Sequence, residues 1–449
     1  MSFSFPLPFE TRMQQQLGTE WSDFASVHTH PAPVSIRLNP YKISQPKEKR
    51  IPWTTQGYYL PERPNFTRDP LFHAGTYYVQ EASSMFLEQV FTQHVDSSTP
   101  LRVLDLCAAP GGKSTHLLSL LPAHSLLISN EVIRSRAQIL AENIVKWGCA
   151  NVMVTQNDPE NFQRLPGFFD VVVVDAPCSG EGLFRKDPQS MQEWSPEHAT
   201  LCSQRQQRIL KDIWPALKEN GILVYSTCTY NSDENEHNLQ WLAQQHKIEF
   251  LKIKTEPAWN IKEITSDIKG YQFFPHRVTG EGFFISAIRK TEVQPELKIR
   301  SGKNFTTATS RIKAEAGKWV QSPERFDMIR QHDLLIAIPT LQFEAMEFLS
   351  GNLHVVSKGT ALAEIKHDKL IPEHALALSI HLNKQAITTI ELSEAEALAY
   401  LRRESLSIPS SDRGFAAVTF QNTPIGWINR LGNRINNLYP VNWRIRMAG

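Results

Sequence analysis

The sequence predicts an α/β protein whose central part is a parallel β-sheet covered by helices on both faces. Between residue 101 and about residue 290, short uninterrupted apolar segments alternate with segments of helical period. Most of the apolar segments are followed by a helix, which is typical of parallel strands buried on both faces. The chain has 449 residues. Because this is too long for one hydrophobic core, we expect two or three domains.

The central region, residues 96–292, supplies the strands and helices of this sheet. Expected strands cover residues 101–107, 125–130, 151–155, 169–175, 221–226, 248–253 and 283–288. Expected helices cover residues 113–121, 134–147, 199–217 and 233–245. In open sheets of this kind, ligands bind at the carboxyl ends of the strands.

Two further regions flank the central one. In residues 1–95 we expect a helix over 9–24, a strand over 35–40, a loop over 53–70 and a helix over 80–91. Residues 293–325 are polar with little apolar periodicity, so we expect a linker. Residues 326–449 predict a small α+β or barrel-like domain, with strands over 333–339, 353–356 and 416–420 and a helix over 394–403.

The composition excludes several classes of protein. Hydrophobic residues make up 41% and charged residues 21%, and no apolar run is long enough for a membrane span. The first 13 residues carry Pro6 and Pro8 without a basic stretch, which argues against a signal peptide. The 5 cysteines have no regular spacing and no zinc-site pattern. We therefore expect free thiols, a cytoplasmic location and no metal.

The formal net charge is +1, but positive charge is concentrated in two segments. Residues 401–449 contain seven arginines against Glu404 and Asp412, and residues 301–330 carry six Lys or Arg against three acids. Such segments can hold phosphates or can be solvated basic surfaces. Charge alone leaves both interpretations open.

A loop of small residues follows the first expected strand, in the segment 105–114. Pro110-Gly-Gly-Lys-Ser114 resembles the end of a phosphate loop, but Cys107 stands where that motif requires glycine. The dinucleotide pattern G-x-G-x-x-G is also absent. Small side chains let the backbone approach a flat or zwitterionic cofactor closely.

Acidic residues stand at four of the expected strand ends. Asp105 and Asp175 end the first and fourth strands; Glu131 follows the second and Asp158 the third. Glu131 can accept both ribose hydroxyls of a nucleoside, and Asp158 can accept from an adenine amino group. Each acid could instead cap a helix or turn, but four in register favour a nucleoside cofactor.

Two cysteines lie in polar turns after expected strands: Cys178 in Asp175-Ala-Pro-Cys-Ser-Gly180, and Cys228 in Ser226-Thr-Cys-Thr-Tyr230. A thiolate that adds to C6 of cytosine makes C5 nucleophilic toward an electrophilic methyl group. The reaction also needs an acid near N3, for which Asp175 is the candidate because Pro177 stiffens the turn. Cys149 and Cys202 are expected to be buried apolar residues.

The segments 105–114, 175–180 and 226–230 resemble the Sun/Nop-type, RsmB/RsmF-like RNA 5-methylcytosine methyltransferases. The resemblance continues through 78–84, 275–277 and 280–284 and covers about residues 70–290. It implies a Rossmann-like class I methyltransferase domain and S-adenosylmethionine as methyl donor. It also implies that Cys228 is the nucleophile and that Cys178 helps release the product. The residues that it implies for the cofactor are Cys107, Ala108, Ala109, Pro110, Gly111, Gly112, Lys113, Glu131, Asp158 and Asp175. Many members carry Asp where this chain has Glu131, and either acid can serve a ribose.

Both ends of the chain resemble the family more weakly. Residues 1–95 look like its N-terminal RNA-binding region, with Arg37 and Asn39 matching an Arg-x-Asn element. The segments 426–434 and 438–444 resemble the PUA-like tail of the RsmF branch. A tail rich in Trp, Tyr and Arg offers stacking surfaces and phosphate contacts, or else forms a compact β core with exposed arginines. The expected partner is structured RNA, with ribosomal RNA favoured over transfer RNA.

Three alternatives remain at this stage: methylation of transfer RNA, an RNA-binding ribosome-assembly factor without activity, and DNA methylation with Cys178 as attacking thiol. Intact Cys178, Cys228 and Asp175 argue against the inactive factor, and the presence of both thiols favours RNA. His116 and His198 are expected to be structural. Three further residues stay open: His276 could line an RNA channel, and Arg185 and Lys186 could hold phosphates or be surface charges.

Overall fold

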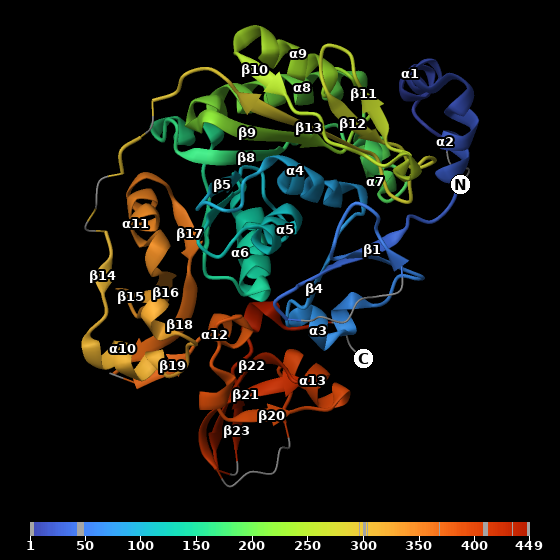
Figure 1. Ribbon diagram of the computed structural model, residues 1–449. Coiled ribbons are helices and arrows are strands. Elements are labelled where there is room, and N and C mark those ends of the chain that lie inside the picture. Colours follow the sequence, from blue (N-terminus) through green and yellow to red (C-terminus); the bar gives the residue numbers. More distant parts are fainter. Residues whose placement is uncertain are drawn as a thin grey trace.

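A ten-stranded mixed sheet forms the centre of the molecule in the computed structural model, with the order β11-β12-β13-β9-β8-β5-β6-β7-β17 and with β10 paired to β13 (Figure 1). The structure describes residues 4–42, 49–295, 297–299, 302, 304–367, 369–406, 412–432 and 434–446. The parallel strands are β5 (Arg102–Asp105), β6 (Leu126–Asn130), β7 (Val152–Thr155), β8 (Phe169–Asp175) and β9 (Leu217–Thr227). These five confirm the expected parallel core.

The remaining strands correct the expectation of a wholly parallel sheet. β10 (Ile248–Phe250), β11 (Lys262–Ile264), β12 (Gly270–Phe273) and β13 (Phe283–Lys290) pair antiparallel, and β13 runs antiparallel to β9. An uninterrupted apolar segment indicates a strand that is buried on both faces of the sheet. Such burial occurs for parallel and antiparallel strands alike. The expected strand over 283–288 is therefore present, but its direction was not encoded in its pattern.

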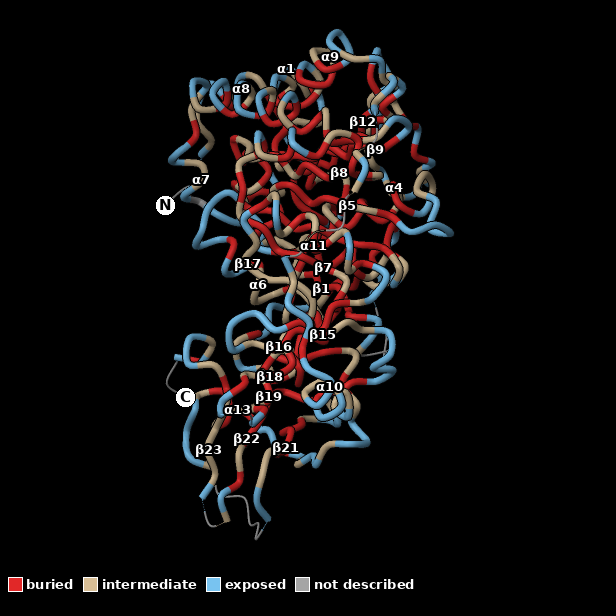
Figure 2. Tube along the Cα trace, turned by 90° about the vertical axis from the view of Figure 1, so that its left-hand side faces the viewer, coloured by how far each residue is buried: buried red, intermediate tan, exposed pale blue. Residues whose placement is uncertain are grey.

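Helices cover both faces of the sheet, and the valines of β8 show how one strand serves both. Val171 and Val173 face a core that includes residues of α4 (Leu87–His94), α5 (Gly112–Leu120) and α6 (Arg134–Trp147). Val172 and Val174 face the opposite core, with α8 (Pro196–Ile213) and α9 (Glu236–Gln245). Side chains alternate along a strand, so consecutive valines are buried on two sides. Figure 2 shows this concentration of buried segments around β5, β8 and β9.

Local sequence signals set the ends of several helices. Ser195 accepts the backbone N–H of His198 at the start of α8, and Gly148 ends α6 with a φ of 90°. Gly111, with a φ of 117°, allows the chain to turn into α5. The helix predicted over 134–147 is confirmed, as is the strand over 169–175.

The N-terminal region contains α1 (Leu7–Leu17), α2 (Trp21–Val27), α3 (Pro70–His73) and a sheet with the order β2-β3-β1-β4. Its strands are β1 (Val34–Leu38), β2 (Lys49–Arg50), β3 (Gly57–Leu60) and β4 (Tyr77–Val79). The expected loop over 53–70 is wrong for β3. Tyr58 and Tyr59 are buried there because β3 pairs with β1, and the surrounding prolines concealed that short strand.

The C-terminal part contains two further sheets. The first has the order β14-β15-β16-β18-β19, and the second β20-β21-β22-β23. The strands of the first are β14 (Thr306–Thr307), β15 (Phe326–Gln331), β16 (Leu334–Pro339), β18 (Thr360–Lys366) and β19 (Lys369–Pro372). Those of the second are β20 (Thr389–Glu391), β21 (Arg413–Phe420), β22 (Thr423–Leu431) and β23 (Ile435–Asn437). The accompanying helices are α10 (Ser310–Gly317), α11 (Phe343–Asn352), α12 (His374–Leu378) and α13 (Glu394–Leu401).

Two expectations for this part need correction. Residues 306–317, expected within a linker, form β14 and α10; β14 pairs with β15, and Ala316 of α10 is buried. The strand expected over 353–356 is β17 (Val355–Lys358), but it does not join the C-terminal sheets. It pairs antiparallel with β7 at the edge of the central sheet, and Leu349 of α11 packs into the core beneath it.

The three regions are joined by polar as well as apolar contacts. The Nζ of Lys42 donates to the Ala74 carbonyl, 2.7 Å away, and to the Lys146 carbonyl, 2.6 Å away, so one side chain ties the ends of α3 and α6. α13 packs against α3, and α12 packs against α6. No helix in the described ranges is both long and apolar enough to cross a membrane.

Candidate active site

The sulfur atoms of Cys178 and Cys228 lie 3.0 Å apart. β8 and β9 are parallel neighbours with Asp175 opposite Ser226, so the turns that follow the two strands meet at one edge of the sheet. The backbone N–H of Cys228 also points to the sulfur of Cys178, at 3.3 Å. Both residues are partly exposed. The structure therefore brings together the two thiols that the sequence singled out.

The surroundings of Cys178 disfavour its thiolate form. The hydrogen bond with Cys228, burial and the nearby charge of Cys228 raise the pKa of Cys178 well above its ordinary value. Cys178 therefore keeps its proton beside Cys228. A protonated thiol donates a hydrogen bond to a neighbouring thiolate but does not itself attack carbon.

The turn that carries Cys178 is held by the buried carboxylate of Glu234. Its Oε2 accepts the backbone N–H of Ser179 at 2.9 Å and the Nε2 of Gln206 at 2.9 Å, and its Oε1 accepts the Ser179 hydroxyl. Glu234 is fully buried. Sequence reasoning missed it, because nothing in the polar turn before α9 distinguishes Glu234 from the neighbouring acids.

Asp175 links the thiols to the small-residue loop. Its Oδ2 lies 2.7 Å from the Nζ of Lys113, and its Oδ1 accepts the Ser226 hydroxyl at 2.8 Å. Lys113 is in the first turn of α5, and Asp175 ends β8 and remains partly exposed. The ion pair therefore joins the loop after β5 to the turn that carries Cys178.

The loop between β5 and α5 is fixed by backbone contacts. The N–H of Ala108 donates to the Asn130 carbonyl at 2.8 Å, Arg136 donates to the Ala109 carbonyl and Asn143 to the Pro110 carbonyl. Cys107, in the same loop, is partly exposed at its surface, yet burial and nearby acids raise the pKa of its thiol. Cys107 is thus a protonated thiol that can line a ligand but is unsuited to attack.

The buried carboxyl of Asp105 provides a test of whether a cationic cofactor fits. Its Oδ2 accepts the Ser114 hydroxyl at 2.7 Å, whereas its buried Oδ1 has no hydrogen-bond partner among the described residues. Burial raises its pKa to about 7. A ligand with a positively charged group would satisfy this oxygen, and S-adenosylmethionine carries an ammonium and a sulfonium.

The other two acids have protein partners already. Glu131 is buried; its Oε1 accepts the N–H of Ile133 at 3.0 Å, and its Oε2 lies 3.5 Å from Arg136. Asp158 caps the short helix that follows it and lies 3.1 Å from Arg208. The capping role considered for strand-end acids is therefore present at Asp158. Such contacts leave carboxylate lone pairs free for further donors.

The residues that were left open have mostly structural partners. Arg185 forms a bidentate ion pair with Glu281, and His276 bonds Glu20 at 2.9 Å. Lys186 is exposed. His116 is buried against Glu88, and burial lowers its pKa to about 4, which confirms its structural role. His198 lies 3.6 Å from the sulfur of the buried Cys202.

Arg37 and Asn39 lie inside the molecule, away from any surface that RNA could reach. Arg37 is completely buried; it donates to Gln80 and Thr115, and its guanidinium lies 4.5 Å from the Trp147 ring. Asn39 donates to the carbonyls of Gly75 and Trp147. The Arg-x-Asn element thus joins the N-terminal region to α5 and α6. Cys149 is buried, as expected. Within the described residues no group of three His, Cys, Asp or Glu side chains could hold a metal.

Comparison with known proteins now places this site in a family. Residues 93–289 match the family model described as 16S rRNA methyltransferase RsmB/F. Ribosomal RNA small subunit methyltransferase F of Escherichia coli O9:H4 (strain HS) is 32% identical over 471 aligned positions, which cover 97% of this chain and 96% of that protein. The chain belongs to the RsmB/F methyltransferase family.

The flanking regions match the same branch. Residues 5–82 match the N-terminal domain of 16S rRNA methyltransferase RsmF, and residues 387–445 match the methyltransferase RsmF PUA domain. The second match covers β20 to β23 and α13. The resemblance drawn from the sequence motifs is thereby confirmed at both ends of the chain.

Solved structures share the fold. A methyltransferase homolog protein from Pyrococcus horikoshii is 28% identical with a TM-score of 0.55, covering 64% of this chain and 96% of that chain. NSun6 from Pyrococcus horikoshii, solved with SFG, is 21% identical with a TM-score of 0.54, covering 64% of this chain and 99% of that one. The Rossmann-like methyltransferase fold is confirmed, and S-adenosylmethionine is the cofactor of this enzyme.

Proposed function

We propose that the chain methylates carbon 5 of a cytidine in small-subunit ribosomal RNA, in the cytoplasm, through a covalent bond between Cys228 and the base. The observation that carries the proposal is the pair of sulfur atoms 3.0 Å apart beside Asp175, at the ends of two neighbouring strands. The ribosomal target rests on the relatives, which are named as ribosomal RNA small subunit methyltransferases.

Cys228 is the attacking group in this proposal, as the resemblance to the family implies, and Cys178 lies beside it with its sulfur 3.0 Å away. The Cys228 thiolate forms a bond to C6 of the cytosine, the C5=C6 double bond is lost, and the electron pair moves toward N3. N3 takes a proton from water, and the Asp175 carboxylate, which is paired with Lys113, accepts a hydrogen bond from the protonated N3. S-adenosylmethionine, when bound, would supply an electrophilic methyl group to C5, and its sulfur would keep the electron pair of the broken methyl–sulfur bond.

Cys178 acts in the release of the product. After C5 has gained the methyl group it loses its proton to water, the C5=C6 double bond reforms and the C6–S bond breaks. The electrons of that bond return to the Cys228 sulfur. The S–H of Cys178, at hydrogen-bonding distance, donates to this sulfur as its negative charge grows.

The cofactor would be held by the loop 107–113 with Glu131, Asp158 and Asp175, and Asp105 would face a positive group. The unpartnered buried Oδ1 of Asp105 supports this placement. Lys113 would hold Asp175 in position through their 2.7 Å contact. We assign the catalytic domain to residues 96–292 and the N-terminal region to 1–95. Residues 306–317, with β14 and α10, go with the C-terminal part that was expected over 326–449.

The test is methyl transfer from labelled S-adenosylmethionine to small-subunit ribosomal RNA by the purified chain, with Cys228→Ala as control. Bisulfite sequencing of RNA from a deletion strain should show one cytidine that loses its methyl group and regains it on complementation. Label found only in transfer RNA or DNA would overturn the ribosomal target. RNA binding without any transfer would instead establish the inactive assembly factor.

A further inference from the structure

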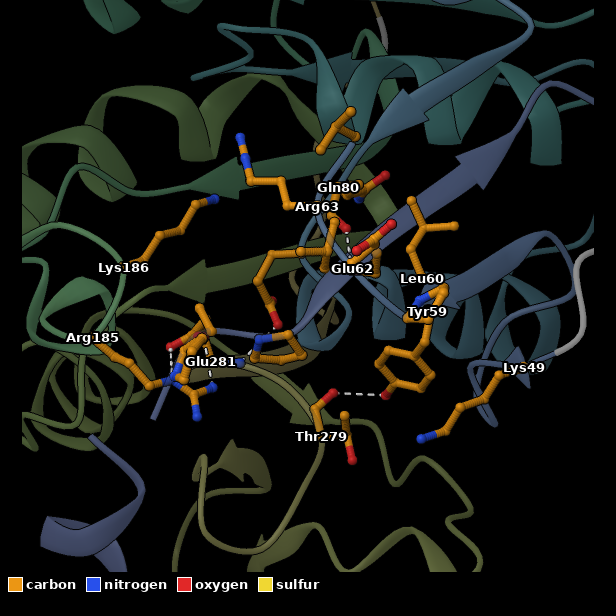
Figure 3. A pocket seen from close by; sticks show the side chains of 18 residues that line it. Lys49, Tyr59, Leu60, Glu62, Arg63, Gln80, Arg185, Lys186, Thr279 and Glu281 are labelled. Atoms are coloured by element: carbon orange, nitrogen blue, oxygen red, sulfur yellow. Dashed lines mark hydrogen bonds and ion pairs between the residues drawn. The ribbon is translucent and has the colours of Figure 1, made fainter. Parts of the chain in front are cut away.

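A cleft of about 1420 Å³ lies between the N-terminal sheet and the segments next to the catalytic turns (Figure 3). One wall comes from the start of β1, the end of β3 and the residues that follow β4. The other wall comes from Arg185, Lys186, Thr279 and Glu281. None of the residues proposed above for catalysis or the cofactor lines it. Small-molecule sites typically occupy about 300–1,000 Å³, so this cleft suits a longer ligand.

The backbone links the wall that carries Arg185 and Lys186 to the catalytic turns. The backbone N–H of Gly182 donates to the Cys228 carbonyl at 2.9 Å, and Arg185 follows three residues later. The backbones of Gly182 and Gly282 pass so close that a Cβ at Gly182 would lie 2.4 Å from the Gly282 carbonyl oxygen. A ligand in the cleft would therefore contact residues 185, 186, 279 and 281, and these segments adjoin the backbone that contacts Cys228.

The cleft is also preformed. The carboxylate of Glu81 accepts the backbone N–H groups of Ser83, Ser84 and Glu281, which ties the two walls together. The Tyr59 hydroxyl donates to the Thr279 carbonyl at 2.7 Å across the other end. These contacts use protein groups from both sides, so the cleft needs no ligand to keep its shape.

The charges of the cleft favour a polyanion. Lys49, Arg63 and Lys186 are exposed, and none of them forms a hydrogen bond or ion pair with any residue that the structure describes. Figure 3 shows Lys186 on the catalytic side, with Lys49 and Arg63 on the N-terminal side. Arg185 is different, because Glu281 neutralises it. Two further acids line the cleft: Glu81, which accepts three backbone N–H groups, and Glu62, which has no hydrogen-bond or ion-pair partner among the described residues.

We infer that this cleft binds the single-stranded RNA segment that flanks the target cytidine, with Lys49, Arg63 and Lys186 contacting phosphates. The inference rests on the proposed function, because it takes RNA as the substrate. A base can reach Cys228 only outside a stacked duplex, so the chain next to it leaves the site as a single strand. Positively charged grooves that follow the backbone are the usual means of holding such strands.

The test measures RNA affinity against salt for the triple variant Lys49→Ala/Arg63→Ala/Lys186→Ala. The matched control is Lys211→Ala/Lys247→Ala/Lys252→Ala, three exposed lysines that do not line the cleft. The probe is a ribosomal RNA fragment with an unpaired flank on each side of one cytidine. Each lost phosphate contact lowers the slope of log K against log salt by about 0.7, so the cleft variant should lose about 2.

We expect the cleft variant to bind the fragment about 10- to 100-fold more weakly near 0.1 M salt, with its affinity for S-adenosylmethionine unchanged. The control triple should keep the wild-type slope. A wild-type slope in the cleft variant, or an equal loss in the control, would overturn the inference. So would equal binding of a probe whose flanks are paired, or competition by polyglutamate as strong as that by RNA.

The variant Arg185→Ala tests whether a cation of the same cleft that is already paired contributes to RNA binding. It should lower the melting temperature, because Glu281 is left buried without its partner, yet leave the salt slope unchanged. These measurements report binding and do not need turnover. If the wild-type chain transfers no methyl group, the proposed function fails while the slopes still decide whether RNA occupies the cleft.

Discussion

The carboxyl edge of the central sheet has two halves with different chemistry. The carboxyl ends of β5, β6 and β7 carry the acids Asp105, Glu131 and Asp158. The turns after β8 and β9 carry the thiols Cys178 and Cys228. The Lys113–Asp175 ion pair marks the boundary between the halves. The acidic half suits a cationic cofactor, whereas the turn of the thiol half that carries Cys178 is followed by Arg185 and Lys186, which line the cleft.

Cys107 shows what this division means for a reactive group. It also follows a strand of the same edge, but it lies in the acidic half, where burial and the charges of Asp105, Glu131 and Asp175 raise its pKa. A thiol that shares space with carboxylates is held in its unreactive form. Position after a strand is therefore not sufficient to make a cysteine at this edge reactive.

The largest expected effect is that of Cys228→Ala. Methyl transfer should fall by about a thousandfold or more, because a covalent nucleophile cannot be replaced by its neighbour. Affinity for S-adenosylmethionine, measured by calorimetry, should stay within about twofold, since that ligand belongs to the other half of the edge. Near-normal turnover in this variant would show that Cys228 is not the attacking group.

Cys178→Ala should separate addition from release. The base can still bond to Cys228, but elimination loses its hydrogen-bond donor, so an RNA–protein adduct should accumulate. Gel electrophoresis under denaturing conditions reveals it as a slowly migrating band. Cys202→Ala, a change at a buried thiol outside the site, should give no such band. Free turnover without adduct in Cys178→Ala would refute the release role.

Glu234→Ala tests a positioning residue in the thiol half. It leaves the Ser179 N–H and hydroxyl and the Gln206 amide without their acceptor, at a cost of about 1–3 kcal/mol for each buried donor. We expect kcat to fall about 10- to 100-fold, with cofactor affinity unchanged. Asp233→Ala alters the exposed neighbour and should have little effect. Equal losses of kcat and cofactor affinity would indicate general unfolding instead.

The smallest effect concerns pH and the acidic half. Because burial raises the pKa of Asp105 to about 7, this carboxyl is mostly neutral at pH 6 and ionised at pH 8. A cationic ligand prefers the ionised form, so affinity for S-adenosylmethionine should rise with pH, up to about tenfold over this interval. Asp105→Asn should remove that dependence. An identical pH profile in this variant would mean that Asp105 does not face the positive group.

The sequence predicted the parts of the fold whose signals are local. β8 and α6 were located with their observed limits, since a buried strand and an amphipathic helix each carry their own pattern. The two thiol turns and the small-residue loop were also recognised, because their residue types are unusual. The parts that failed depend on distant partners. β3 forms by pairing with β1, and β14 by pairing with β15. Such short strands have too few residues to show the alternation of apolar and polar side chains.

The same limit applied to charged residues near the site. Arg37, Arg185 and Lys186 are equivalent in a sequence. In the structure Arg37 is buried and Arg185 is neutralised by Glu281, whereas Lys186 has no ion-pair or hydrogen-bond partner among the described residues. Their partners lie 43 and 96 residues away for Arg37 and Arg185. Glu234 was missed for a related reason: its role is to bind Ser179, which lies 55 residues earlier in the chain. Which charged side chains are available to a ligand depends on contacts between residues far apart in the sequence. A short stretch of sequence does not show these contacts.

The pairing of β17 with β7 has a consequence for any attempt to shorten this enzyme. Residues 355–358 seal the open border of the catalytic sheet, and the His354 carbonyl accepts the Gln156 backbone N–H just beyond β7. A fragment ending after β13 would leave the amides and carbonyls of β7 bare. An exposed edge strand can pair with the same strand of another copy, so such a fragment should aggregate.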